Sequence, residues 1–373
     1  MNNRQLHIGW DNSSARRSRT GTGVYASQLI WELSESPDVT LEVLNGWDMA
    51  QEGHGIFARA ARSVSRLAWN HWYLPHIIQK RRFDVFHGPA FITPLPCPCP
   101  SVVTIHDVSF RLFPGYFERR WLLYVTSMLP RLLRSVSAVI TVSHHAKSDL
   151  LSFYDVPSAK VHVVHNGIDH SRFNPGVQLD AAWASSVGLR SGYILHVGEL
   201  SDRKNLLTLL RAIDLLRAKG TWGQRQLVLA GPETPGMTGA DEIRETIRRL
   251  HLSDIVVSLG RIDHDLLPGL YRCASLFVMP SLYEGFGLPI LESMACGIPV
   301  VASNTSSLPE VAGDAAIFVP PKDEHALADA IEQVLDNPRL AAELRAKGLV
   351  RAKQFNWQRT AEKTVEVYRS VAK

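Results

Sequence analysis

Apolar positions along this chain follow two different periods. Short runs of β-branched residues alternate with segments in which apolar side chains recur every three or four positions. One such stripe consists of Tyr25, Ala26, Leu29, Ile30 and Leu33, and its spacing predicts an amphipathic helix. Strands that alternate with helices predict an α/β protein, with parallel sheets covered by helices.

The predicted strands fall into two groups. The first group covers residues 6–10, 40–44, 84–87, 101–105, 138–142 and 161–164. The second group covers residues 193–197, 226–230, 255–258, 275–279, 300–302 and 316–319. Two such groups predict two lobes, each built on its own parallel sheet.

The boundary between the lobes is expected near residues 166–169, where Asn-Gly is a turn signal. We therefore predict an N-terminal lobe over residues 1–168 and a C-terminal lobe over residues 169–356. A last helix, within residues 357–373, is expected to be able to return to the first lobe. The length of 373 residues suits two cores of this kind.

The composition is that of a globular protein, with 45% hydrophobic and 20% charged residues. No apolar run reaches the roughly 18–20 residues needed to cross a bilayer, and the first residues show no signal-peptide pattern. We therefore expect a cytoplasmic protein, either free or at the cytosolic face of a membrane.

The net charge of +4 is distributed unevenly. Residues 1–167 carry 17 Lys and Arg against 12 Asp and Glu, whereas the remainder carries 23 against 24. This basic excess indicates an acidic or membrane-bound partner for the first lobe, and a solvated basic surface is the alternative.

The segment from Pro280 to Gly297 combines glycine, proline and two carboxylates directly after a predicted strand. Pro289 suits the first turn of a helix, and Gly297 suits the position past its end. A glycine-containing loop that leads into a helix N-terminus presents N–H groups to a phosphate or a sugar oxygen. Glu284 precedes this helix and Glu292 lies within it. With no positive charge expected nearby, such carboxylates suit sugar hydroxyls better than phosphates; a capped helix with a surface glutamate is the alternative.

Arg203 and Lys204 follow another predicted strand, at the start of a helix. Open α/β sheets bind ligands at the carboxyl ends of their strands. Arginine holds a diphosphate through paired hydrogen bonds, and lysine acts as a point charge. We predict a diphosphate contact here, with a solvated basic pair as the alternative.

Two features of the first lobe suggest contacts with the same ligand. His106 ends a predicted strand, where it would face a cleft between two lobes, and we expect it to position the ligand. Asp107 is expected to aid orientation or acceptor binding. Residues 21–26 fit the dinucleotide pattern G-x-G-x-x-A, but ten residues separate them from the preceding strand. Those ten residues include Arg16, Arg17 and Arg19, and they suit an acceptor or phosphate loop better than the pyrophosphate turn of a dinucleotide site.

Asp263 and Asp265 form an Asp-x-Asp pair that superficially matches a metal-binding motif. They precede a predicted helix over residues 266–273, where aspartate is a common N-cap, and we interpret them as a cap. The four cysteines show neither zinc-ligand spacing nor a disulfide framework. No metal requirement is predicted.

The ordered set of motifs resembles the retaining glycosyltransferases of family four, also described as glycosyl transferases group 1. The most specific part is Glu-x7-Glu, from Glu284 to Glu292, followed by Met-Ala-Cys-Gly-Ile-Pro-Val-Val-Ala-Ser. The other matching pieces, in chain order, are residues 21–23, 104–107, 142–143, 166–169, 198–205 and 259–261. The resemblance covers nearly the whole chain and implies the GT-B fold, two Rossmann-like lobes with a cleft between them.

This resemblance implies that a hexose moves from a nucleoside-diphosphate sugar with retention of configuration. Glu292 is implied to bond the ribose hydroxyls, Glu284 the donor sugar, and His106 the donor sugar and its phosphate. The further donor-binding positions are Gly23, Arg203, Lys204, Arg261, Phe286, Gly287 and Leu288. The chain departs from the family at Glu199, where many relatives have arginine, so neutralisation of the phosphates rests more on Arg203 and Lys204.

Similarity also suggests a mannose- or rhamnose-type sugar, a glycan or lipid-linked acceptor, and a role in bacterial surface polysaccharide synthesis. No cofactor besides the donor substrate and no nucleic-acid partner are expected. Two alternatives remain. One is an NAD(P)-dependent oxidoreductase, on the match at residues 21–26. The other is a GT-B binding subunit without catalysis.

A peripheral membrane contact is a further expectation for the first lobe. Arg59, Arg62 and Arg66 fall on one face of a predicted helix within residues 56–78, and aromatic and basic residues follow up to Arg82. Such a segment suits the headgroups of an anionic bilayer. A core-packed helix with an ordinary basic face fits equally well.

Overall fold

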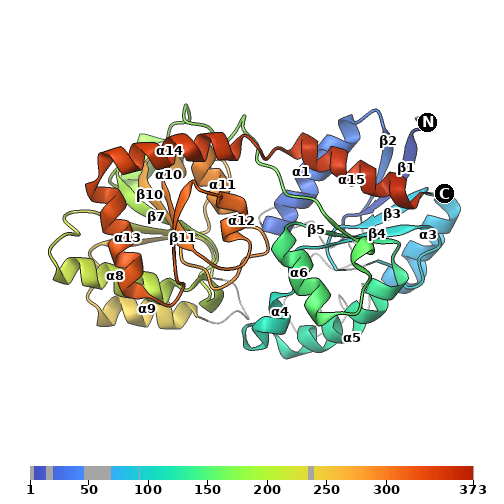
Figure 1. Ribbon diagram of the computed structural model, residues 1–373, viewed down its shortest axis with the longest axis horizontal. Helices are drawn as coiled ribbons and strands as arrows, with labels where there is room; N and C mark the ends of the chain where they lie inside the picture. Colours follow the sequence, from blue (N-terminus) through green and yellow to red (C-terminus); the bar gives the residue numbers. More distant parts are fainter. Residues whose placement is uncertain (1–3, 14–19, 46–68, 92, 234–238, 373) are drawn as a thin grey trace. The chain divides into compact units, whose positions relative to one another are not determined.

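The computed structural model describes residues 4–13, 20–45, 69–91, 93–233 and 239–372. The chain divides into two compact units (Figure 1). The first consists of residues 1–108, 120–167 and 357–373, and the second of residues 109–119 and 168–356. Residues 109–119 thus group with the second unit, which a single division at residue 168 does not foresee.

A sheet of six parallel strands forms the centre of the first unit, in the order β2-β1-β3-β4-β5-β6. Its strands are β1 (Leu6–Asp11), β2 (Val39–Leu44), β3 (Val85–Gly88), β4 (Ser101–Ile105), β5 (Ala138–Thr141) and β6 (Val161–Val163). The central strands β3, β4 and β5 are buried along their whole length, as parallel strands covered on both faces are expected to be.

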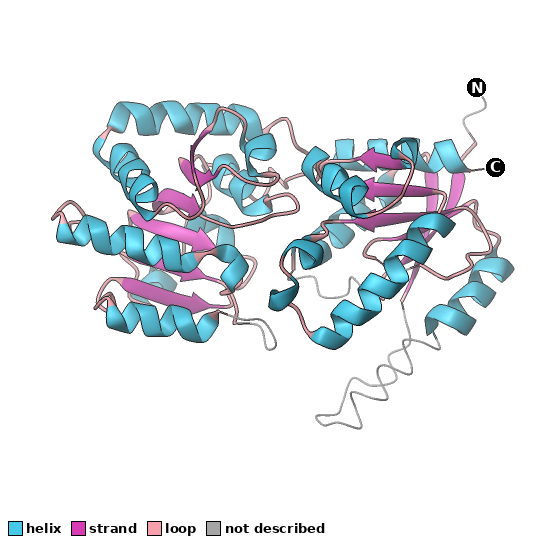
Figure 2. Cartoon of the chain, turned by 60° about the horizontal axis from the view of Figure 1, so that its bottom comes forward, coloured by secondary structure: helices cyan, strands magenta, loops and turns pink. Residues whose placement is uncertain are grey.

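Helices cover both faces of this sheet (Figures 1 and 2). On one face, α1 (Gly21–Glu35) packs against α15 (Trp357–Val371) at the end of the chain. The other face carries α3 (Leu74–Arg81), α5 (Arg119–Ser135) and α6 (His144–Phe153). A short π-helix, η1 (Trp69–Tyr73), and a short 3₁₀-helix, η3 (Ser158–Lys160), complete the described part of this unit.

The second unit has its own sheet of six parallel strands, in the order β12-β11-β10-β7-β8-β9. Its strands are β7 (Tyr193–Val197), β8 (Leu227–Ala230), β9 (Val256–Gly260), β10 (Ala274–Met279), β11 (Val300–Ser303) and β12 (Ala316–Val319). From β7 the chain winds towards β9, and from β10 it winds the opposite way. The winding therefore reverses between the neighbours β7 and β10.

Helices also flank this second sheet. On one side lie α8 (Leu206–Ala218), α9 (Ala240–Arg249) and α13 (Glu324–Asp336), which contact one another through α8. The other side carries α10 (Leu267–Arg272), α11 (Leu288–Ala295), α12 (Leu308–Ala312) and α14 (Pro338–Ala352). The shorter elements are α4 (Ser109–Leu112), η2 (Pro114–Tyr116), α7 (Ala181–Ser186) and η4 (Asp202–Lys204).

Every strand lies within two residues of its predicted bounds, so the predicted α/β class with two Rossmann-like lobes is confirmed. Residues 21–26 form the first turns of α1, in agreement with the predicted helical stripe that begins at Tyr25, and Thr20 caps this helix by accepting a hydrogen bond from the Gly23 N–H at 3.1 Å. Residues 14–19, with three arginines, and most of segment 56–78 lie outside the described residues.

Candidate functional site

The candidate site of the second unit forms where β7 and β10 end side by side. These neighbours pair directly, and the winding of the sheet reverses between them. Such a reversal leaves a crevice at the carboxyl ends of the strands, which is where open α/β sheets bind ligands. Arg203 and Lys204 lie in η4 after β7, and Glu284 lies in the loop after β10. The topology thus brings together residues that are about 80 positions apart in the sequence.

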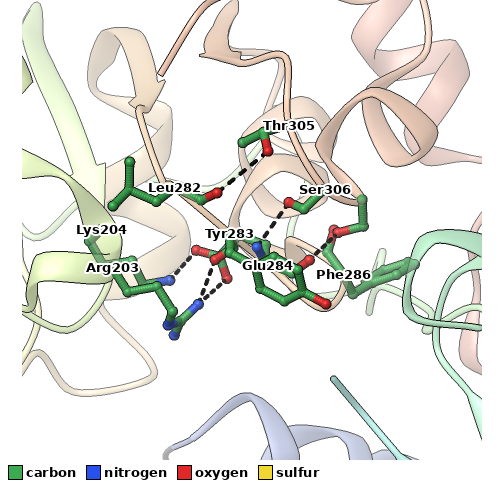
Figure 3. A network of polar contacts seen from close by, with 9 residues as sticks. Arg203, Lys204, Leu282, Tyr283, Glu284, Phe286, Thr305 and Ser306 are labelled. Carbon is green, nitrogen blue, oxygen red and sulfur yellow. Dashed lines mark hydrogen bonds and ion pairs between the residues drawn. The ribbon is translucent and has the colours of Figure 1, made fainter. Parts of the chain in front are cut away.

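Glu284 forms two ion pairs with the basic residues after β7 (Figure 3). Lys204 Nζ donates to Glu284 Oε1 at 2.6 Å, and Arg203 Nη1 donates to Oε2 at 3.1 Å. Arg203 Nη1 also donates to the Tyr283 carbonyl oxygen at 2.8 Å. The expectation that Glu284 has no positive charge nearby is therefore wrong, because the neighbours come from a distant part of the sequence.

The three charged side chains are largely withdrawn from water, with Lys204 and Glu284 exposed by only 8% and 10%. Burial alone would raise the pKa of Glu284, but the Lys204 and Arg203 charges outweigh it and lower this pKa to about 2. Burial lowers the pKa of Lys204, and the Glu284 charge opposes this shift. The carboxylate is consequently ionised at neutral pH, held between two cationic side chains.

The loop that carries Glu284 is also held by hydroxyl groups of residues 305–307, of which Thr305 and Ser306 are labelled in Figure 3. Ser306 Oγ accepts the Glu284 N–H at 2.9 Å. Ser307 Oγ donates to the carbonyl oxygens of Glu284 and Phe286, both at 2.8 Å. On the β7 side, the Leu282 N–H donates to the Arg203 carbonyl oxygen at 2.9 Å. The position of Glu284 is therefore fixed through its backbone as well as its carboxylate.

Helix α11 begins directly after this loop, as predicted. Gly287 is its N-cap with φ +104°, a backbone conformation that favours glycine, and Pro289 lies in the first turn. Gly297 follows the helix with φ +73°, again as expected. N–H groups in the first turn of a helix have no acceptor within the helix and attract anions or electron-rich oxygens. Leu288 therefore belongs to an element suited to a phosphate or a sugar oxygen.

Glu292 lies in α11 but does not belong to the ion-paired cluster. Its Oε2 accepts the Tyr271 O–H at 2.7 Å, and the carboxyl group is buried. Burial raises the pKa of Glu292 to about 7, although the Tyr271 hydrogen bond and the Arg172 charge act to lower it. Tyr271 was not singled out in the sequence, because nothing local marks a tyrosine of α10 as the partner of a carboxylate in α11.

Arg261 follows the edge strand β9, and β8 separates it from the end of β7. Arg261 therefore lies at the same edge of the sheet as the Glu284 cluster, but it is two strands away from β7 and exposed, and it does not belong to that cluster. The interpretation of Asp263 and Asp265 as a helix cap is wrong. The N-cap of α10 is Leu266 without a side-chain hydrogen bond, and Asp265 instead pairs with Arg172 at 3.2 Å.

Two predicted site residues of the first unit, His106 and Gly23, lie after a central strand and in the first helix of that unit. His106 follows β4, is half-buried, and its Nε2 lies 2.9 Å from the Pro89 carbonyl oxygen. Because a carbonyl only accepts, we assign the ring proton to Nε2, and burial lowers the pKa of His106. Its Nδ1 then carries a lone pair that can accept a hydroxyl hydrogen bond. Gly23 is buried in the first turn of α1.

A buried chain of hydrogen bonds lies next to His106. The Tyr25 ring packs edge-on against the His106 ring with the centroids 4.8 Å apart. Thr104 Oγ1 lies 2.9 Å from the Tyr25 hydroxyl and 2.8 Å from His87 Nε2. His87 Nδ1 lies 2.6 Å from the hydroxyl of Tyr368 in α15. Sequence reasoning missed this chain, since its members come from four separate elements.

Two family models match the chain, one for each half. The model described as Glycosyl transferases group 1 matches residues 183–351, and the model described as Glycosyltransferase Family 4 matches residues 19–172. The O-antigen chain mannosyltransferase B of Escherichia coli is 33% identical over 287 residues, covering 76% of this chain and 74% of that protein. This chain belongs to the group 1 glycosyltransferases.

A second relative and two solved structures are also similar to this chain. The MMP α-(1→4)-mannosyltransferase of Mycolicibacterium hassiacum is 33% identical over 77% of this chain and 70% of its own length. The sucrose-phosphate synthase structure from Thermosynechococcus elongatus covers 98% of this chain and 99% of its own, at a TM-score of 0.77 and 23% identity. The Anabaena HepE structure with UDP and glucose covers 98% of this chain and 100% of its own. Its TM-score is 0.75 and its sequence identity is 17%. These structural likenesses show the GT-B fold.

Membership in the group 1 glycosyltransferases decides against the oxidoreductase alternative. The dinucleotide-like residues 21–26 lie inside α1 rather than at the turn after β1, and the family model covers them. Arg203, Lys204, Glu284 and Glu292 all lie within the group 1 match. The site geometry can therefore be interpreted as that of a glycosyltransferase.

Proposed function

We propose that this glycosyltransferase moves a mannose- or rhamnose-type hexose from a nucleoside-diphosphate sugar to a glycan or lipid-linked acceptor with retention of configuration. The pathway we propose is the synthesis of a bacterial surface polysaccharide at the cytosolic face of the membrane. The observation that carries the proposal is the Arg203–Glu284–Lys204 cluster, which combines groups for a diphosphate with a group for a sugar hydroxyl. Two similar proteins named as mannosyltransferases support the type of sugar.

The cluster suits a departing diphosphate because it provides cationic donors in a site of low exposure. Negative charge develops on the β-phosphate as the bond to the anomeric carbon breaks, and preorganised donors stabilise it. Arg203, Lys204 and the N-terminus of α11 are the donors that we assign to this task. They can do so without a divalent metal, and we propose that none is required and that no cofactor besides the donor substrate takes part.

Glu284 suits a sugar hydroxyl better than a nucleophilic role. Each carboxylate oxygen has two acceptor sites, and one site on each is used by Lys204 or Arg203. The remaining sites can accept hydroxyl groups. A carboxylate whose pKa is held at about 2 by two cations is a weak nucleophile. We therefore assign attack to the acceptor hydroxyl, on the face from which the diphosphate leaves.

A panel of GDP-, UDP- and dTDP-sugars, assayed with oligosaccharide and lipid-linked acceptors, tests this proposal. We expect one donor to raise the melting temperature, to release its nucleoside diphosphate, and to yield a product with the donor's anomeric configuration, also in excess EDTA. Activity that is lost in EDTA and restored by magnesium would contradict metal independence. Nucleotide binding without transfer to any acceptor would favour the binding-subunit alternative.

The first unit carries a surface that suits the proposed membrane-linked acceptor. Helix α5 contains no acidic residue, and its exposed side chains include Arg120, Leu123, Tyr124, Arg131 and Arg134. Arginines with apolar and aromatic side chains between them match the headgroup region of an anionic bilayer. Among the described residues, no helix has both the length and the apolar character that spanning a bilayer requires. We therefore propose a peripheral contact through α5.

Co-sedimentation with vesicles tests this contact. The protein should bind vesicles that contain anionic lipid, less at high salt, and the double variant Leu123→Ser, Tyr124→Ser should bind several-fold less. Trp31→Ser in α1 is the control, because Trp31 is also exposed (61%) but lies on the other face of the first sheet. Equal binding to neutral vesicles at both salt concentrations would contradict an electrostatic contact.

A further inference from the structure

Ser306 adopts a left-handed backbone conformation, with φ +54°, just before helix α12. Residues other than glycine, asparagine and aspartate rarely adopt this backbone conformation, because their Cβ crowds the following carbonyl group. Backbone strain of this kind persists where the surrounding structure imposes it, and it clusters at functional sites. A serine that is retained in such a conformation must contribute something that glycine would not.

The hydroxyl group of Ser306 makes a contact that a glycine could not make. Ser306 Oγ accepts the backbone N–H of Glu284 at 2.9 Å (Figure 3). The neighbouring hydroxyls of Thr305 and Ser307 act on the opposite groups, since they donate to carbonyl oxygens of residues 282, 284 and 286. Of these three hydroxyls, only that of Ser306 binds the Glu284 amide. A glycine at this position would relieve the strain and lose the contact.

The contact holds Glu284 at the end opposite to its ion pairs. The carboxylate is held by Arg203 and Lys204, and the amide by Ser306. A bound diphosphate competes with Glu284 for the two cations, so the carboxylate loses part of its support at the moment when it has to meet a sugar hydroxyl. The Ser306 contact does not involve the cations and therefore persists.

We propose that Ser306 is a positioning residue for sugar transfer, which keeps Glu284 directed at the donor sugar while Arg203 and Lys204 bind the diphosphate. This inference rests on the proposed function of Glu284. A serine that only serves the fold would show activity that follows stability. A positioning serine would show activity that follows the hydroxyl group.

Two substitutions separate these roles. Ser306→Gly removes the strain but also the acceptor of the Glu284 N–H, so we expect a melting temperature close to that of wild type and a kcat lower by roughly three- to tenfold. Ser306→Thr keeps the hydroxyl but adds a β-branch in a left-handed conformation, so we expect a lower melting temperature and a kcat within about twofold of wild type. His251→Gly is the matched control, because His251 has φ +52° in the same unit and lies, exposed, after α9. It should leave kcat unchanged.

Binding provides a readout that does not depend on turnover. Ser306→Gly should bind the bare nucleoside diphosphate with wild-type affinity, within about twofold, but should lose part of the additional affinity that the donor sugar provides. A wild-type kcat for Ser306→Gly, or a kcat that follows melting temperature across both variants, would overturn the proposal. Failure of the proposed function is a different result, namely no transfer by the wild-type protein from any nucleoside-diphosphate sugar.

Discussion

Both units of this glycosyltransferase place polar side chains at the carboxyl ends of parallel strands. These side chains are ionised in the second unit and neutral in the first. In the second unit, Arg203, Lys204 and Glu284 are ionic groups that pair with one another. In the first unit, His87 and His106 are imidazoles surrounded by hydroxyl groups, aromatic rings and a carbonyl oxygen. The two units therefore offset the cost of burying a polar group in two different ways.

The buried side chains of the second unit remain ionised because each is paired with a side chain of opposite charge. Removing one partner of a buried ion pair typically costs about 3–5 kcal/mol, since the other charge stays without compensation. In the first unit the groups avoid charge instead. Burial lowers the pKa of His87 to about 3, helped by the neighbouring His106, so the ring is neutral at physiological pH. Neutral rings with one donor and one acceptor suit hydroxyls, whereas the cationic cluster suits phosphates.

The largest effect is expected from removing both cations of the second unit. The double variant Arg203→Ala, Lys204→Ala should lower kcat/KM by about 10³-fold or more, because each charged contact contributes about 2–5 kcal/mol to binding or to the transition state. The protein should still fold, since Glu284 can take up a proton once its cations are gone. Steady-state kinetics and thermal unfolding measure both effects.

Arg211→Ala is the control for this double variant, because Arg211 lies exposed in the adjacent helix α8. It should retain wild-type kinetics. The double variant should lose more affinity for a nucleoside diphosphate than for the monophosphate. An equal loss for both nucleotides would place the contact elsewhere than on the second phosphate.

A smaller effect is expected for Glu284→Gln, which should slow transfer but strengthen binding of the nucleoside diphosphate. Transfer should fall about 100-fold, because a hydrogen bond to a charged acceptor contributes about 1.5–3 kcal/mol. Affinity for the bare nucleoside diphosphate should rise, because Arg203 and Lys204 lose their competing carboxylate. The exposed pair Lys219–Glu332, at 2.5 Å, provides the control, since Glu332→Gln should change neither property. Weaker diphosphate binding by Glu284→Gln would contradict the proposed competition.

Much of this architecture follows from local sequence patterns. The strands β4, β7 and β12 begin and end where their apolar runs do, and α15 (Trp357–Val371) lies within the predicted residues 357–373. The proline and glycine that bracket α11 also act locally, through fixed and left-handed φ angles. Such features depend on a few neighbouring residues, and a sequence contains them directly.

The contacts of the site could not be predicted in the same way. The Glu284 ion pairs join residues about 80 positions apart, and the Tyr368 contact with His87 spans 281 positions. Both depend on strand order and register, which place β7 beside β10 and α15 over the first sheet. Ser306 carries no local signal at all, because its role becomes visible only from its φ angle and from the loop opposite.

Glu292 is a buried carboxyl group that should change between its neutral and ionised forms near neutral pH. Its folded-state pKa of about 7 lies above the ordinary value of 4.5, so the folded protein binds more protons between these two pH values. This contribution stabilises the fold at low pH and is lost as the pH rises through about 7. Glu292→Gln should therefore gain about 2 kcal/mol of unfolding free energy relative to wild type between pH 5.5 and pH 8.

Urea unfolding at several pH values measures this difference. The groups that face Glu292 are Tyr271, Arg172 and Cys296. Burial raises the pKa of Tyr271 well above 10 and that of Cys296 to about 12, so neither titrates in this range. Affinity for a nucleoside diphosphate should rise with pH more steeply in wild type than in Glu292→Gln. Parallel pH profiles for the two proteins would show that Glu292 does not titrate near neutrality.

The smallest effect on activity is expected in the first unit, for Tyr368→Phe. The lost hydroxyl leaves buried His87 Nδ1 without its partner at 2.6 Å, which should cost about 1–3 kcal/mol of stability. Tyr368 is linked to His106 only indirectly, through the neighbouring His87 and through the Tyr25 ring, so kcat should fall by roughly two- to threefold. Tyr193→Phe is the matched control, because the Tyr193 hydroxyl donates to the Leu270 carbonyl oxygen at 2.6 Å, at the opposite end of the second sheet from the ion pairs. Both variants should lose similar stability, but only Tyr368→Phe should change kcat. If both left kcat unchanged, the neutral chain would serve the fold alone, and His106 would be held by Pro89 without its help.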